Sequence, residues 1–372
     1  MDQDVPTYKE LLARTDAPPG SSWGVFGPDD QLGTLNFLTA QTARRAAGLV
    51  SAGTVYNLDY PLNTFVPSIA GTRPAASHHM FSNNPNHRDD WLDSFYLQST
   101  TQVDGLRHMR HPQYGFYGGV ADAAIAVDRP ELGIQLVAEK GIVGRGVLID
   151  LPRYFSAAGR DYDLTVNQMI WPADLDAALA AQGVALESGD IALLRTGWSG
   201  YYLGLSPAEQ ARVRSVLRAP GLGQSPEMVG YLWDHQVAMV ASDNGGVEAH
   251  PVNPDSGFVI PGEEIPSRGP SHNGMLHRPL IALLGLFLGE CWKLEELAEA
   301  CAADGRYEFL LTAKPLNLIG GVGSPANAMA SSSRRLLARG FRCRRLLLPP
   351  VPAAAATAGS GGDPAPRWPG AG

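Results

Sequence analysis

Residues 98–108 read Gln98-Ser-Thr-Thr-Gln-Val-Asp-Gly-Leu-Arg-His108 and follow a largely apolar segment, 91–97, that resembles the approach to a strand. Successive side chains of a strand point to opposite faces, so an extended stretch over 97–105 presents four polar groups on one face. These four residues are Gln98, Thr100, Gln102 and Asp104. A short turn can bring His108 back to the same face. The pattern fits either a half-exposed strand or the wall of a metal or proton-transfer site.

A second group of chemically active side chains lies in 272–294, where His272, His277 and Glu290 flank an apolar run. On one straight helix, the thirteen residues from His277 to Glu290 would span about 20 Å. The two side chains share a site only if the chain reverses between them. Gly285 offers that reversal, with 286–290 returning as a strand. A glutamate after an apolar run is otherwise a cap or an edge residue, and His272 competes with His277 for the site.

The bulk composition is that of a globular protein, with 44% hydrophobic and 18% charged residues among 372. No basic–apolar leader begins the chain, and the longest apolar run, 279–288, is too short to span a bilayer. We therefore expect a cytoplasmic protein with no membrane partner. The net charge is −8, but residues 1–330 carry 22 basic and 36 acidic side chains, which argues against nucleic acid as a partner. The three cysteines lack metal-site spacing and are interpreted as buried thiols.

Strands and short helices follow one another along the chain. Apolar runs predict buried strands at 144–152, 187–198 and 237–244, and further strands at 54–60 and 307–313. Amphipathic patterns and capping residues predict helices at 7–14, 39–50, 172–183, 206–217, 227–235 and 293–301. The glycine-rich turns have no spacing of a nucleotide-binding loop, so a nucleotide site is not expected.

Two loops are candidates for contact with a ligand. Segment 61–90 is rich in Pro, Asn, Ser and Gly and holds three histidines, His78, His79 and His87. Long loops in compact domains are often functional, so these histidines belong either to a substrate lid or to a solvated loop. Segment 111–119 places Tyr114 and Phe116 among glycines, which suits a loop over a flat substrate or a packed loop equally well.

Residues 98–108 resemble the signature H-x-G-T-H-x-D-x-P-x-H of the cyclase/kynurenine-formamidase family of metal-dependent hydrolases. Thr101, Asp104 and His108 match it. Gln98 and Gln102 stand where the family has its two metal-binding histidines, so the chain resembles a divergent His-to-Gln subgroup. The remaining departures are Thr100 in place of Gly and Leu106 in place of Pro. The strands at 144–152, 187–198 and 237–244 also resemble family segments, and the likeness extends over about residues 20–330.

The resemblance implies an α/β fold in the swivelling β/β/α arrangement, with a barrel-like mixed sheet and short helices outside. It implies that His108 and Asp104 are catalytic, with His108 as proton donor and acceptor. The implied metal ligands are Gln98, Gln102, Asp104, His277 and Glu290. An N-terminal tryptophan lies against the substrate in the family, which points to Trp23. Together with the loop aromatics, the candidate substrate contacts are Trp23, Tyr114 and Phe116.

The implied reaction is metal-assisted hydrolysis of an amide-like C–N bond in a small aromatic compound. An aryl formamide, as in arylformamidase and tryptophan catabolism, a lactam or a cyclic imide would each suit it. A divalent metal activates water and a carbonyl oxygen, and a histidine moves the proton to the leaving amine. We expect Mn or Zn, with Mg as a further choice because amide and carboxylate oxygens suit hard cations. The family also implies a homo-oligomer, either a dimer or a tetramer.

Two other functions stay open. A site without metal would use Asp104, His108 and Glu290 as plain acid–base groups of a cyclase, dehydratase or isomerase. A non-catalytic small-molecule binding protein could also use this scaffold. Turnover that resists chelators would indicate the first, and ligand binding without turnover the second.

The domain boundary is expected near residue 330. Residues 1–330 form a single catalytic domain in this interpretation. Residues 331–372 contain seven Arg and one Asp and are rich in Ala, Pro and Gly, a composition with little to bury. We expect this tail to be disordered, and it is interpreted either as out-of-frame translation or as a functional basic tail.

Overall fold

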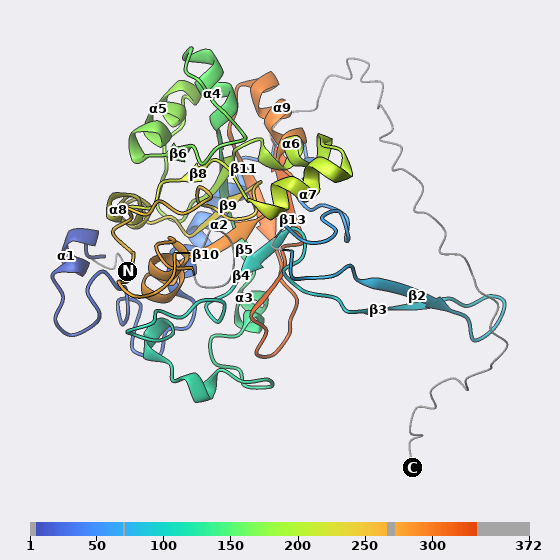
Figure 1. The fold of residues 1–372 in the computed structure, drawn as a ribbon, viewed down its shortest axis with the longest axis horizontal. Helices are drawn as coiled ribbons and strands as arrows, with labels where there is room; N and C mark the ends of the chain where they lie inside the picture. Colours follow the sequence, from blue (N-terminus) through green and yellow to red (C-terminus); the bar gives the residue numbers. More distant parts are fainter. Residues whose placement is uncertain (1–4, 70, 266–271, 333–372) are drawn as a thin grey trace. The chain divides into compact units, whose positions relative to one another are not determined.

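The computed structural model is built around a nine-stranded mixed sheet and describes residues 5–69, 71–265 and 272–332 (Figure 1). In spatial order the strands are β1 (Thr54–Asn57), β13 (Ala328–Ser332), β11 (Glu308–Ala313), β5 (Ile142–Asp150), β7 (Ile191–Arg195), β9 (Met239–Ser242), β10 (Phe287–Glu290), β4 (Gln102–Asp104) and β12 (Gly323–Pro325). The four strands β5, β7, β9 and β10 are parallel. Antiparallel strands flank this parallel centre on both sides.

The parallel strands are those with continuous apolar runs, because a parallel sheet is covered on both faces. Every residue of β9 and β10 is buried, as are most of β5 and β7. Short helices lie outside the sheet. They are α1 (Tyr8–Leu12), α2 (Ala40–Ala47), α3 (Ile134–Lys140), α4 (Leu151–Ala157), α5 (Pro172–Gln182), α6 (Trp198–Gly204), α7 (Pro207–Ser215), α8 (Pro226–Asp234) and α9 (Glu295–Asp304). No helix in the described ranges is long and apolar enough to cross a bilayer.

Local capping signals set several helix ends as predicted. The Thr39 side chain accepts from the backbone at the start of α2, and Ser206 does the same for α7, which has Pro207 in its first turn. Gly183 ends α5 in the left-handed conformation that glycine adopts without strain. These ends depend on residues a few positions apart, which is why the sequence predicts them.

The predicted chain reversal between His277 and Glu290 is present. A helical turn at Arg278–Leu283 ends just before Gly285, which has a φ of 68°. A Cβ at this position would lie 2.8 Å from the Cα of Gly33, so only glycine fits this close approach. The chain returns as β10, and the side chains of His277 and Glu290 meet.

The predicted strand over 97–105 is shorter than expected, because only Gln102–Asp104 forms β4. The residues just before β4 are held by side-chain hydrogen bonds and not by the hydrogen bonds of a strand ladder. Thr101 Oγ1 donates to the Cys291 carbonyl at 2.6 Å and accepts from the Tyr60 amide at 2.9 Å. Gln98 therefore reaches the site from a turn and not from the face of a strand.

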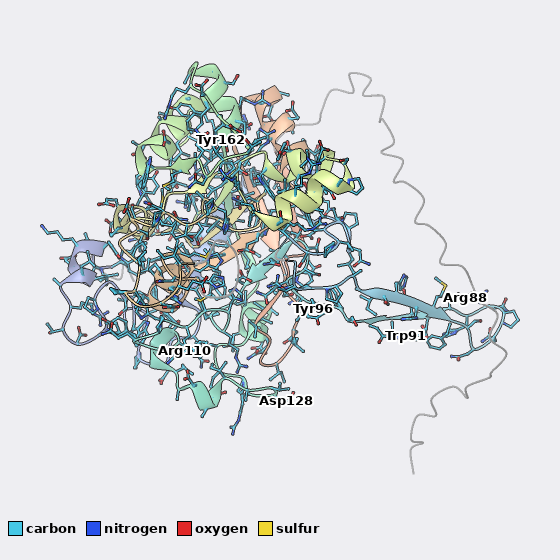
Figure 2. All side chains as sticks on the ribbon, viewed as in Figure 1. Arg88, Trp91, Tyr96, Arg110, Asp128 and Tyr162 are labelled. Carbon is cyan, nitrogen blue, oxygen red and sulfur yellow. The ribbon has the colours of Figure 1, made fainter. Side chains whose placement is uncertain are left out.

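Segment 61–90 was expected to be a loop, but part of it forms a hairpin that extends away from the sheet (Figure 1). Its strands are β2 (Ser77–Phe81) and β3 (Asp89–Asp93). We call residues 77–93 the arm. Nine of its ten strand residues are exposed, so the arm lacks the apolar alternation by which a half-buried strand is recognised. Figure 2 shows Arg88 and Trp91 out on the arm and Tyr96 near its base.

The predicted boundary at residue 330 lies within a strand. β13 runs to Ser332, and Ser331 pairs with Val55 of β1. The rest of the expected tail, residues 333–372, lies outside the described residues. Of the cysteines, Cys291 and Cys301 are buried free thiols, as predicted, and Cys343 is outside the described ranges.

Candidate active site

A cavity of about 360 Å³ lies beside the carboxyl ends of β9 and β10, where Gly245 and Cys291 form part of its wall. This is the edge of a parallel sheet at which ligands usually bind. Five of the side chains predicted from the sequence also line it: Gln98, Gln102, His108, His277 and Glu290. Asp104 lies next to them and is fully buried.

Asp104, at the end of β4, forms the first group with Gln98 and His108. The Gln98 amide nitrogen donates to Asp104 Oδ1 in a short hydrogen bond and also lies 2.9 Å from His108 Nδ1. Asp104 Oδ2 has no hydrogen-bond partner among the described residues and lies 3.8 Å from His108 Nε2. Gln98 thus holds the carboxylate and the imidazole at fixed positions on one side of the cavity.

A second group is a buried chain of hydrogen bonds centred on His277. Its Nδ1 lies 2.6 Å from Glu248 Oε1, and its Nε2 lies 3.0 Å from Glu290 Oε1. The other oxygen of Glu290 accepts from the Gln102 amide at 2.6 Å. Because Gln102 and Glu290 stand opposite each other in the β4–β10 ladder, sheet register fixes this contact.

Burial and neighbouring charges shift the ionisation of these groups. Burial raises the pKa of Asp104, and the charge of His108 opposes that rise. Burial works against a charged His277, yet the hydrogen bonds to Glu248 and Glu290 outweigh it and hold its pKa well above the usual value. Burial also opposes the Glu248 carboxylate, but the bond from His277 lowers its pKa overall. Each ring nitrogen of His277 thus faces a carboxylate oxygen, and a cation bound there would take the place of the proton on Nε2.

The donor set fits a hard divalent cation. Asp104, His277 and Glu290 are buried and offer ligand atoms that all lie within 4.8 Å of one another. The unpartnered Oδ2 of Asp104 is costly to bury, and a cation would satisfy it. Two carboxylates and one imidazole suit Mn or Mg. The ligand role predicted for Gln98 and Gln102 requires each amide to turn its oxygen inward, because both now turn N–H groups toward carboxylates.

His272 and His277, the two competing histidines, both belong to the cavity. The centres of their rings are 5.2 Å apart, and the centre of His108 is 6.1 Å from each of them. These three histidines form a second set whose possible ligand atoms lie within 4.8 Å of one another. Only His277 belongs to both sets, so it is the better candidate for a ligand.

The predicted aromatic contacts lie elsewhere. Trp23, Tyr114 and Phe116 are absent from the described residues that line the cavity. The Trp23 indole donates to the Ala282 carbonyl at 2.9 Å, and Tyr114 stacks on His111 with ring centres 4.7 Å apart. Phe116 packs against the core. The three histidines of segment 61–90 also lie outside the lining and contact aspartates of the arm at 2.8–3.1 Å.

Sequence reasoning missed three residues of the site. Glu248 is fully buried and accepts hydrogen bonds from the backbone of Leu276 and from Gln224 as well as from His277. His250 lines the cavity, and its Nε2 has no partner among the described residues. Arg73 is the third. A Glu and a His, two and four residues after the Gly-Gly that follows β9, were a signal that could have pointed to two of them.

The fold and the buried acid–base cluster define an α/β protein with an enzyme-like site at a sheet edge. A family model described as a putative cyclase matches residues 56–249. A crystal structure described as a novel cyclase is 32% identical, with a TM-score of 0.71, and the match covers 84% of this chain and 99% of that chain. The chain therefore belongs to the putative cyclase family, and the predicted family and fold class are confirmed.

Isatin hydrolases share this fold at lower identity. One, bound to the product analogue thioisatinate, is 17% identical over 79% of this chain and 98% of that chain, with a TM-score of 0.51. Isatin hydrolase A from Labrenzia aggregata, bound to benzyl benzoate, is 16% identical over 78% and 96%, with the same TM-score. The comparison with curated proteins gave no match.

Proposed function

We propose that this protein is a hydrolase that opens an amide-like C–N bond of a small aromatic compound, assisted by a divalent cation. The observation that carries the proposal is the buried set of Asp104, His277 and Glu290, with an unpartnered Asp104 oxygen beside His108. Isatin hydrolases share the fold, and their name refers to hydrolysis of isatin, a compound with such a bond.

The chain's own residues suit the proton transfers of that reaction. Gln98 donates to His108 Nδ1, so the neutral ring carries its proton on Nε2. The pair of Asp104 and His108 first takes the proton that the attacking water loses, with the unpartnered Asp104 Oδ2 as the acceptor. The protonated pair then gives a proton to the leaving nitrogen as the C–N bond breaks, so the pair returns to its starting state. The oxygen of that water remains on the carbonyl carbon, so the products are a carboxylic acid and an amine.

Asp104, His277 and Glu290 would hold the cation, and Glu248 would position His277 from behind. When bound, a divalent cation lowers the pKa of water and polarises a carbonyl oxygen. Mn or Mg is favoured over Zn because two of the three ligands are carboxylates.

The test is elemental analysis of protein purified without an affinity metal column, together with hydrolysis of formanilide and isatin. We expect about one or two Mn, Mg or Zn ions per chain and turnover that a chelator abolishes and Mn restores. Protein that takes up no metal after incubation with Mn, Mg and Zn, or that hydrolyses neither compound when loaded, would contradict the proposal.

A second candidate is a metal-free acid–base reaction, such as a cyclisation, dehydration or isomerisation. The amide N–H groups of Gln98 and Gln102 already satisfy one oxygen each of Asp104 and Glu290, as a cation would otherwise do. Turnover of a C–C or C–O substrate that survives complete removal of metal would favour this candidate.

A further inference from the structure

Arg73 forms part of the cavity wall and carries one of the positive charges of its described lining. The guanidinium donates to the Gln98 carbonyl in a short hydrogen bond. We call this contact the clasp, because it joins the two chain segments that lead to and from the arm. The planar guanidinium has five N–H donors, and the clasp uses part of this capacity.

Within the described residues, Arg73 has no ion pair with a carboxylate, whereas eight other arginines form one. A half-buried guanidinium without a counter-ion is suited to bind an anion, because Arg matches the planar geometry of a carboxylate. Arg214 of α7 also lines the cavity, and the described lining contains no lysine. The positive side of the cavity is therefore formed by two arginines.

The cavity also has a negative group, formed by Glu290 in its wall and the buried Asp104. Arg73 is close to it: burial and the Glu290 charge raise the pKa of Cys291, and the charge of Arg73 opposes that rise. The backbone carbonyl of Gln98 accepts from Arg73, and the side-chain nitrogen of Gln98 bonds to both Asp104 and His108. An anionic group on Arg73 would thus lie in the same cavity as His108 and Glu290.

We propose that Arg73 binds a carboxylate of the substrate, so that the class of substrate is a small aromatic amide with a carboxylate near the scissile C–N bond. An N-acylated aminobenzoate has this form. The inference rests on the proposed function, because it names the substrate of that same site. Arg73 is a specificity-determining residue in this proposal, since it contacts a part of the substrate that does not react.

The test compares two probes of equal size, 2-aminobenzoate and its neutral amide 2-aminobenzamide, by calorimetric titration. The protein should bind the acid more tightly. Arg73→Gln should weaken binding of the acid by about 10-fold or more, as expected for a charge-assisted bond, and leave the amide unchanged. Arg73→Lys should restore part of the preference. Arg88→Gln, on the arm, is the matched control and should behave as wild type.

The clasp provides the competing explanation, in which Arg73 only holds Gln98 in place. In that case Arg73→Gln would weaken both probes equally, and the inference would be overturned. Failure of the wild-type protein to prefer the acid would overturn it too. Hydrolysis of formanilide without that preference would leave the proposed function standing. An Arg73-dependent preference without hydrolysis of N-formyl-2-aminobenzoate, formanilide or isatin would keep the anion site and overturn the proposed function.

Discussion

Gln98 and Gln102 each donate a hydrogen bond that holds a carboxylate. At both positions the signature of the family has a metal-binding histidine. An amide is neutral and offers a weak, hard oxygen, whereas imidazole is a strong ligand for zinc. The two substitutions therefore change which cation suits the cavity without removing its buried carboxylates. Under the proposed function, these residue types would therefore favour Mn or Mg.

The variant Gln98→His/Gln102→His tests this choice of cation. Two imidazoles beside Asp104 would create a set of ligands typical of zinc, so we expect zinc affinity to rise at least 10-fold over wild type. Competition with a chromophoric chelator measures it. Gln113→His/Gln210→His, outside the cavity, is the control for added histidines. Equal zinc affinity in all three proteins would show that positions 98 and 102 are not ligands.

Sequence reasoning identified seven of the residues that line the cavity, because the motif at 98–108 and the histidines and glutamate of 272–290 are local patterns. Glu248 was missed, although it lies just after the Gly-Gly that follows β9, because the local pattern does not show its role. Its role depends on contact with His277, 29 residues further along, and on a buried position that only the packing of the sheet creates. Arg73 was missed for a similar reason, since nothing in the sequence joins it to Gln98.

Among the elements, the arm differs from the rest because its strands bury almost nothing. Two of its large apolar side chains, Met80 and Trp91, are 64% and 48% exposed, respectively. An isolated two-stranded hairpin is marginally stable in water, so the arm contributes little to the stability of the sheet. Its three His–Asp contacts are exposed and add little for the same reason.

Shortening the arm should leave the fold intact. Replacing residues 80–90 by Asn-Gly joins His79 to Trp91, which already face each other across the hairpin, by a favoured two-residue turn. We expect the thermal midpoint to change by less than about 2 °C, since little surface is lost from the core. Calorimetry measures this, and sedimentation gives the mass. A large fall in either quantity would show that the arm is held by a further contact, such as a second copy of the chain.

Helices with strong caps were predicted well and the arm was not, for the same physical reason. Capping depends on side chains three residues apart, as at Ser206 and Glu209. The arm has charged and imidazole side chains on both faces, and such a pattern is also that of a loop. The length of β4 was overestimated because contacts with Cys291 and Tyr60, distant in sequence, end the ladder.

For the whole molecule, buried acids govern how stability responds to pH. Burial is the main cause that raises the pKa of Asp59 and Asp243 to about 6 and of Asp190 to about 7. The folded state therefore binds these protons at a higher pH than the unfolded chain does. Their contribution to stability is fully present below about pH 4 and is lost as the pH rises through 6 to 7.

Asp243→Asn isolates one of these groups. Asp243 accepts from Thr196 and Gly197, and losing part of these bonds imposes a cost that is the same at every pH. From pH 4 to pH 7, the free energy of unfolding of the wild type should fall relative to the variant by on the order of 3 kcal/mol. Urea denaturation measures it, with the exposed Asp161→Asn as control. Parallel pH profiles for wild type and Asp243→Asn would contradict the expectation.

The sheet topology was within reach of the sequence only through its resemblance to a family. Apolar runs identify the strands of the parallel centre, but strand order depends on contacts between distant residues. Gln102 and Glu290, for example, are 188 positions apart. Nothing local specifies that β4 completes the sheet beside β10, and this pairing is what brings the two halves of the cavity together.

The clasp between Arg73 and Gln98 separates the arm from the residues at its root. The two regions differ in how much sequence change they tolerate. Substitutions, insertions or a reporter group between these residues extend or decorate the arm while the ends stay fixed. Changes at the two ends reach the cavity directly. In a collection of natural or engineered variants, we therefore expect arm length and composition to drift widely while the residues at its root stay constant.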